Sequence, residues 1–108
     1  MKLTAEQISE KYKPSQLIAI EVDLDRSGEY ATTVVFICPP RSIWYGPFAK
    51  AVELNEVAAT EQLVKQHCLT HEPVELEAMW EEFPAVYDQA VKGFIAAKNR
   101  GVREKKLT

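Results

Sequence analysis

The hydrophobic period of this chain changes at the adjacent prolines Pro39 and Pro40. Before them, residues 16–25 place large apolar side chains at every second position, and residues 29–38 are rich in β-branched and aromatic types, which predicts two strands. After them, apolar residues recur every three to four positions, as on one face of an α-helix. The pattern predicts an α+β fold, with an N-terminal antiparallel β-hairpin (about 16–38) followed by a small helical bundle of about four helices (about 42–100).

The predicted hairpin cannot be stable by itself, because two isolated strands are marginal in water. The first strand would place one face toward a core, and residues 25–28 (DRSG) are typical of a turn with glycine at its last position. Either helices cover one face of the hairpin, or a third strand comes from elsewhere in the chain. The core face of the first strand would consist of Ile18, Ile20, Val22 and Leu24.

A short helix is expected ahead of the hairpin. Thr4 followed by Gln7 is a capping-box pattern, and it predicts a helix from Ala5 to about Tyr12. Pro14 would end this helix, because the residue before a proline is disfavoured in helical conformation.

Four cap and break signals divide the helical part. Gly46-Pro47 interrupts the first helix, so we expect one short turn with Ser42 as its N-cap, and then a helix proper from Pro47. Asn55 would cap a helix over 56–69, and the connector 70–73 leads to a helix over 74–82. The apolar stripe of the 56–69 helix would be Val57, Thr60, Leu63, Val64, His67 and Cys68.

Pro84 is placed as the first residue of the last helix, with Gly101 as the residue that ends it. We therefore expect a single domain over 1–101 and a mobile, basic C-terminal tail over 102–108. Aromatic residues at helical spacing predict core positions in this region. They are Trp80, Phe83, Tyr87 and Phe94.

Composition excludes several classes of function. The formal net charge of −3 argues against a general nucleic-acid binder. No apolar run approaches the roughly 20 residues of a membrane-spanning helix, and the polar N-terminus does not read as a secretory signal. We therefore expect a cytoplasmic protein in which Cys38 and Cys68 are free thiols.

Catalytic and metal-binding patterns are weak. No glycine-rich phosphate loop, nucleophile elbow or isolated carboxylate is present, so no enzyme activity and no cofactor are expected. One alternative stays open, a small cytosolic metal-binding or regulatory protein that uses Cys38, His67, Cys68 and His71. His67 and His71 are four residues apart, as helical zinc ligands can be, but the apolar stripe favours core roles for His67 and Cys68.

Trp44, Tyr45 and Phe48 form the candidate partner-binding patch. Adjacent helical residues diverge by about 100° and cannot both face one core, so either Trp44 or Tyr45 should be exposed. Tryptophan and tyrosine often anchor interfaces. The break at Gly46 could turn both outward, with the acidic residues between 72 and 88 as a polar rim. The alternative is an aromatic lid that closes the hairpin against the bundle.

From Val34 onward the chain resembles the tail assembly chaperones, or minor tail-component proteins, of long-tailed phages and prophages. The resembling stretches are FICPPRSIWYGPFAKA, ATEQLVKQHCLTHEP and ELEAMWEEFPAVYDQAVKGFI; Gly46-Pro47 departs from the family's continuous helix. The resemblance implies a protein without catalytic residues that binds the tape-measure protein, and also tail-tube subunits, during tail assembly in the bacterial cytoplasm. It also implies a longer, frameshifted form in many members. Self-association is a further expectation.

Overall fold

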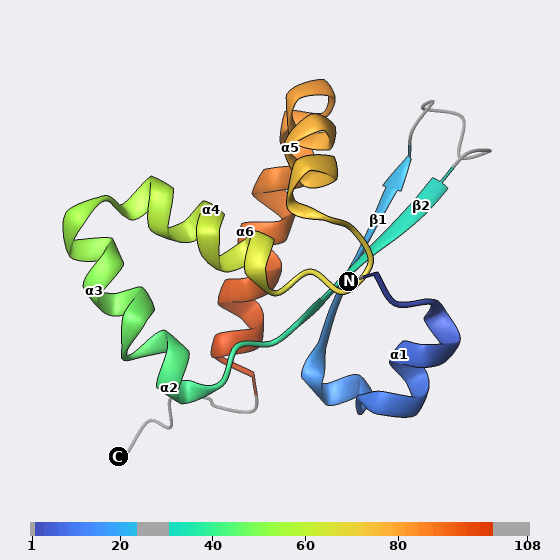
Figure 1. Cartoon of the computed structure of the whole chain (residues 1–108), viewed down its shortest axis with the longest axis horizontal. Helices are drawn as coiled ribbons and strands as arrows, with labels where there is room; N and C mark the ends of the chain where they lie inside the picture. Colours follow the sequence, from blue (N-terminus) through green and yellow to red (C-terminus); the bar gives the residue numbers. More distant parts are fainter. Residues whose placement is uncertain (1, 24–30, 101–108) are drawn as a thin grey trace, which may run out of the picture.

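The computed structural model describes residues 2–23 and 31–100. Its hairpin, followed by five helices in that part of the chain, confirms the predicted α+β class (Figure 1). The elements, in order, are α1 (Ala5–Lys11), the 3-10 turn η1 (Pro14–Gln16), β1 (Leu17–Asp23), β2 (Ala31–Ile37), α2 (Arg41–Trp44), α3 (Pro47–Leu54), α4 (Glu56–Gln66), α5 (Pro73–Glu82) and α6 (Pro84–Lys98).

The strands β1 and β2 pair without interruption from Leu17↔Ile37 to Asp23↔Ala31. The alternation predicted for β1 is confirmed where the structure describes it, because Ile18 is buried on the side against which α6 packs. Leu24, the 25–28 turn, Gly101 and the 102–108 tail lie outside the described residues.

Residues 67–70, between α4 and α5, supply a third strand-like segment beside β2 (Figure 1). The Ile37 N–H donates to the His67 carbonyl over 2.9 Å, and the Leu69 N–H donates to the Val35 carbonyl over 2.8 Å. The N-terminus joins the same segment, because the Leu3 N–H donates to the Leu69 carbonyl over 2.8 Å. Of the two ways to stabilise the hairpin, the structure therefore uses both: α6 on one face and an added segment at one edge.

The predicted helix over 56–69 is wrong at its end. The helix α4 stops at Gln66, because the backbone of His67 and Leu69 bonds to β2 rather than continuing the helical ladder. The side chain of Thr70 completes the junction, since its Oγ1 accepts the Val35 N–H at 3.1 Å.

The core lies between the hairpin and the helices, where Phe36 and Phe94 meet edge to face at 5.3 Å. Phe94 is buried, as predicted for a core aromatic. The other three predicted core aromatics are half-buried at the margin of the core. Trp80 and Phe83 pack against the cluster, and the Tyr87 ring lies 4.9 Å from Trp80.

Two predicted helix caps are present. In the capping box, the Gln7 N–H donates to Thr4 Oγ1 (3.3 Å) and the Thr4 N–H donates to Gln7 Oε1 (2.8 Å). Asn55 Oδ1 accepts the Ala58 N–H at 3.1 Å, which satisfies one of the free donors at the start of α4. Pro84 is the first residue of α6, also as predicted.

Gly93 allows α6 to lie close on β1. A Cβ at this position would come within 2.7 Å of Ile18 Cγ2, a branch close to the backbone that has little freedom to move. We expect Gly93→Ala to lower the free energy of unfolding by about 1–3 kcal/mol through overpacking. Denaturant unfolding checks the sign, because a sterically free helical glycine would instead gain about 1 kcal/mol on the same change.

Thr70 provides a test of the junction beside β2. Thr70→Val keeps the shape but removes the acceptor of the Val35 N–H, so we expect a loss of about 1–3 kcal/mol. Thr70→Ser keeps the oxygen and is the matched control. Equal unfolding midpoints for the two variants would mean that this hydrogen bond does not support the segment.

Candidate partner-binding surface

Gly46 produces the predicted break between α2 and α3. Its backbone angles (φ −116°, ψ −107°) are not helical, and a Cβ there would lie 2.5 Å from the Ser42 carbonyl oxygen. Only glycine allows so close a passage. The new helix begins at Pro47, as predicted, but Ser42 is not the N-cap of the first turn, because α2 already begins at Arg41 with Pro40 before it.

Trp44 and Tyr45 face in different directions. Trp44 is only 8% exposed, and its ring packs edge to face on Phe48 (5.4 Å) and Phe94 (6.4 Å). Tyr45 is 65% exposed. The expectation that one of the pair is exposed is confirmed, and the idea that both splay outward is wrong. Trp44 and the half-buried Phe48 are packed at the core, so Tyr45 is the exposed member of the three.

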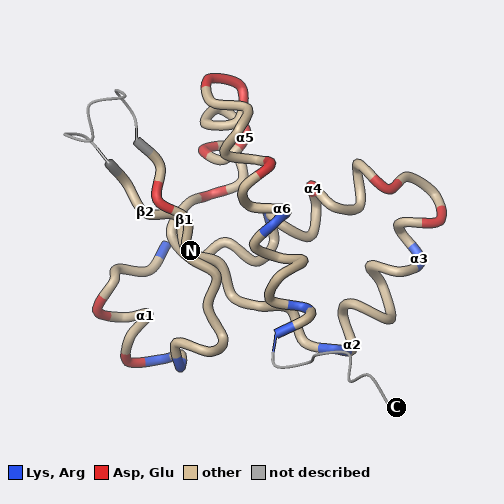
Figure 2. Tube along the Cα trace, turned by 180° about the vertical axis from the view of Figure 1, so that it is seen from behind, with Lys and Arg blue, Asp and Glu red and all other residues tan. Residues whose placement is uncertain are grey.

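Basic groups surround Tyr45. Lys98 Nζ lies 5.0 Å from the centre of the Tyr45 ring and 5.3 Å from that of Trp44, and the Arg41 guanidinium carbon lies 5.7 Å from Tyr45. Such cations over aromatic faces are attractive. Figure 2 shows acidic residues on α5 and where α3 meets α4, with basic ones near α2 and the C-terminal end of α6. The expected acidic rim is therefore wrong.

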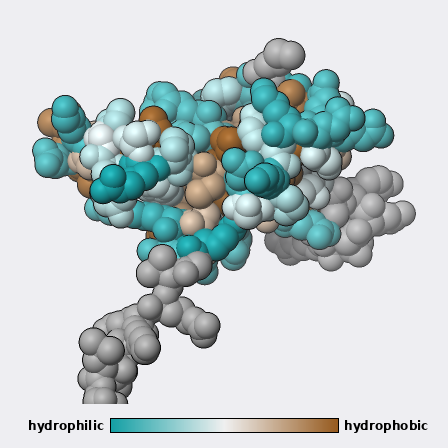
Figure 3. Space-filling view, turned by 90° about the horizontal axis from the view of Figure 1, so that it is seen from below, coloured by the Kyte–Doolittle hydropathy of each residue, from teal (hydrophilic) through white to brown (hydrophobic). Residues whose placement is uncertain are grey.

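The helices α2, α3 and α4 form an arm that extends away from the hairpin (Figure 1). The helix α3 packs chiefly against α2 and α4 and has no buried residue. At its end Leu54 is 91% exposed, and Val57, at the start of α4, is 64% exposed. Val57 was predicted within the apolar stripe, and that prediction is wrong, because its side chain stays exposed where it lines a cavity between α4 and α6. Apolar atoms appear among hydrophilic ones at this end in Figure 3.

A cavity of about 210 Å³ lies between α3 and α4 and is mainly apolar. We use the name arm surface for this cavity together with the exposed side chains of Tyr45, Leu54 and Val57, of which Val57 lines a separate cavity between α4 and α6. Leu54 was not singled out from the sequence. The available signal was an apolar residue directly before the helix cap Asn55, at a corner where two helices turn and few neighbours can cover it. The cavity is lined by Ile43, Pro47, Phe48, Ala51, Ala59 and Leu63, with two glutamines.

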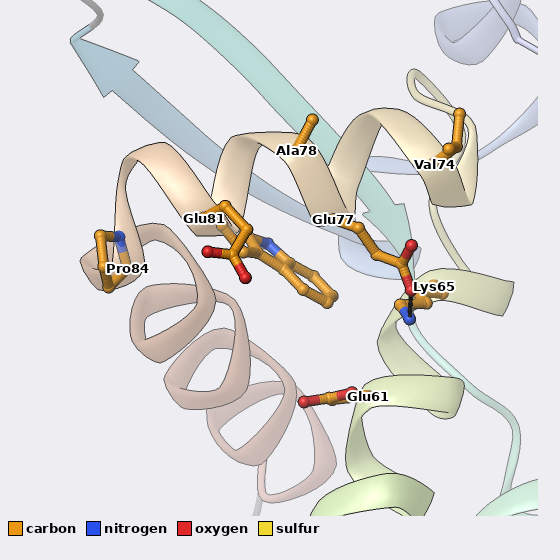
Figure 4. A pocket seen from close by; sticks show the side chains of 8 residues that line it. Glu61, Lys65, Val74, Glu77, Ala78, Glu81 and Pro84 are labelled. Carbon is orange, nitrogen blue, oxygen red and sulfur yellow. Dashed lines mark hydrogen bonds and ion pairs between the residues drawn. The ribbon is translucent and has the colours of Figure 1, made fainter.

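An acidic pocket of about 590 Å³ lies between α4 and α5 (Figure 4). The carboxylates of Glu61, Glu77 and Glu81 line it. Lys65 forms an ion pair with Glu77 and lies 5.9 Å from the Trp80 ring centre. The chain's own lysine thus occupies the place over the indole where an external cation would bind.

The four candidate metal ligands do not converge. His67 Nδ1 lies 2.7 Å from the Leu63 carbonyl, His71 Nδ1 lies 2.7 Å from Thr70 Oγ1, and both cysteines are free. Within residues 2–23 and 31–100, no three His, Cys, Asp or Glu side chains are grouped as a metal site. His67 and Cys68 lie on the segment beside β2, not on a helical stripe as predicted.

Comparisons with known proteins yield no relatives. No family model matches the chain, and no curated protein and no solved structure matches it significantly. Among the described residues there is also no helix with the length and apolar character to cross a lipid bilayer. The resemblance to tail assembly chaperones therefore rests on the sequence pattern alone.

Tyr87, beside the acidic pocket, provides a pH test. Burial raises its pKa above the ordinary 10.0, and the charges of Glu61 and Asp88 raise it further. The folded state therefore holds the phenolic proton more tightly than the unfolded state. This contribution to stability is complete below pH 10.0 and is lost as the pH rises through the folded pKa.

We expect the unfolding free energy of the wild type to fall more steeply above pH 10.0 than that of Tyr87→Phe. Denaturant unfolding of both proteins at matched alkaline pH values measures the difference. Parallel curves would show that the Tyr87 phenol titrates alike in the folded and unfolded chains.

Proposed function

We propose that this protein is a non-enzymatic assembly chaperone that binds a helical segment of another protein on the arm surface. The observation that carries the proposal is the exposure of Leu54 and Val57 at the end of an arm whose helix α3 has no buried residue. The resemblance supports a tape-measure protein as the partner, with tail-tube subunits as further partners, in the cytoplasm of a bacterial host.

The arm surface has the chemistry for this task. Covering an exposed leucine or valine contributes about 1.5–3 kcal/mol, and an aromatic anchor such as Tyr45 about 2 kcal/mol or more when it is central to an interface. An amphipathic helix laid on a groove buries side chains at a spacing of three and four residues. The cavity between α3 and α4 can receive one such side chain.

The partner has matching requirements. A long helical chain exposes apolar stripes until it is sheathed by tube subunits, and such stripes aggregate. A protein that holds it needs apolar contact area and a charged surface elsewhere, and it needs no chemistry. The acidic residues of α5 provide such a charged surface (Figure 2).

Substitution of the arm surface tests the proposal. Leu54→Lys with Val57→Lys places charges at exposed positions, so the melting temperature should stay within a few degrees of the wild type. On co-expression with the tape-measure protein of the same genome, the variant should lose the pull-down and leave that protein insoluble. Val74→Lys, at a position 71% exposed on α5, is the matched control and should keep the partner soluble.

Tyr45→Ala examines the aromatic contribution without disturbing the core, whereas Trp44→Ala would also remove a packed indole. A folded Leu54→Lys, Val57→Lys variant that still keeps the tape-measure protein soluble would place the partner site elsewhere. Loss of binding in the Val74→Lys control as well would point to a general charge effect rather than to the arm surface.

A further inference from the structure

The outer edge of β1 has free backbone groups. The Cys38 N–H donates to the Gln16 carbonyl over 2.7 Å, and this bond fixes which residues of β1 face β2. Gln16 and Cys38 are therefore a hydrogen-bonded pair of the ladder. In an antiparallel ladder, hydrogen-bonded pairs alternate with pairs that share no hydrogen bond. Ala19 and Glu21 therefore direct their N–H and C=O groups away from β2. None of these four groups has a partner among the described residues.

Arg100 limits the free edge at one end. Its guanidinium donates to the carbonyl of Ser15 and, over 3.3 Å, to that of Leu17. The stretch that remains open begins at Ala19. It contains no proline, lysine or bulge, which are three of the devices that protect exposed edges, and its charged residues are Glu21 and Asp23.

The opposite edge of the sheet is occupied. Residues 67–70 cover β2 at Val35 and Ile37, and Leu3 covers the segment in turn. In the described part of β2, Ala31 and Thr33 are left with outward backbone groups next to the covered stretch. The outward residues of β1 beyond Arg100 are Ala19, Glu21 and Asp23, so β1 offers the longer open stretch for an added strand.

The space beside this edge is hollow and lies under α6. Two cavities of about 220 Å³ and 470 Å³ share Ile20, Glu21 and Gln89, and one reaches Gly93 on α6. An added strand would place alternate side chains toward α6 there.

We propose that the β1 edge pairs with the β1 edge of a second copy of this chain, antiparallel about a two-fold axis at Ile20. Ala19 then lies opposite Glu21 of the second copy, and the two symmetric pairs exchange both of their backbone hydrogen bonds. A two-fold axis at Glu21 would place like charges opposite each other. One at Ala19 would require the Leu17 carbonyl, which Arg100 already engages.

This two-fold pairing closes at two copies, because each chain uses its β1 edge and the β2 edge is covered at Val35 and Ile37. The contact is short, so we expect a weak dimer with a dissociation constant of roughly 10 µM to 1 mM. The inference does not depend on the proposed function, because the arm surface takes no part in it.

Sedimentation equilibrium on the full chain over roughly 10 µM to 1 mM tests the dimer. The wild type should fit a monomer–dimer equilibrium. Ala19→Pro removes an N–H that the hairpin does not use, so the fold should survive while the protein stays monomeric. Ala19→Ser, which keeps the N–H, is the matched control and should dimerise. Circular dichroism melting confirms the fold of each variant.

A charge variant tests the register independently of Ala19→Pro. Ala19→Lys faces Glu21 of the second copy in two symmetric pairs and should tighten the dimer roughly two- to tenfold. Adding Glu21→Lys to it should abolish that gain. A wild type that is monomeric throughout, a folded Ala19→Pro that dimerises, an Ala19→Lys that does not tighten the dimer, or assembly beyond two copies would each overturn the proposal.

Discussion

The hydrogen bonds between β2 and residues 67–70 are the interaction on which the rest of the structure depends. A two-stranded hairpin of seven pairs would be marginal alone. The segment adds backbone bonds at Val35 and Ile37, and because it connects α4 to α5 it also fixes where the helical part meets the sheet. The N-terminus is tied to the same segment through Leu3, so three distant parts of the chain meet at one place.

This arrangement leaves two surfaces available. With one edge of the sheet occupied and α6 across one face, β1 keeps its outer edge, while the arm of α2, α3 and α4 extends in the opposite direction in Figure 1. The proposed partner contact on the arm surface and the proposed contact between copies therefore do not compete. A dimer would present two arm surfaces to one long helical partner, and two linked contacts bind more tightly than one.

Local rules predicted much of the fold. The period change at Pro39-Pro40, the capping box at Thr4 and the break at Gly46 each depend on residues close in sequence, and each is confirmed.

The strand-like segment was missed because His67 and Cys68 fit the helical period, whereas the hydrogen bonds that hold them beside the sheet come from β2, about thirty residues earlier. The angle of about 100° between adjacent helical residues showed that Trp44 and Tyr45 must differ in exposure, but only tertiary packing decides which of them is buried. The exposure of Leu54 and Val57 was not predicted for the same reason, since exposure at a corner depends on what the rest of the chain leaves uncovered.

Amide hydrogen exchange at Ile37 and Leu69 tests the account most directly, because these two N–H groups make the bonds that join β2 to residues 67–70. If these bonds hold the hairpin to the helical part, both amides should exchange only by global unfolding, with the same protection as the hairpin amides that lie between β1 and β2. Exchange of Leu69 and Ile37 at the rates of exposed loop amides, while the hairpin amides stay protected, would contradict it.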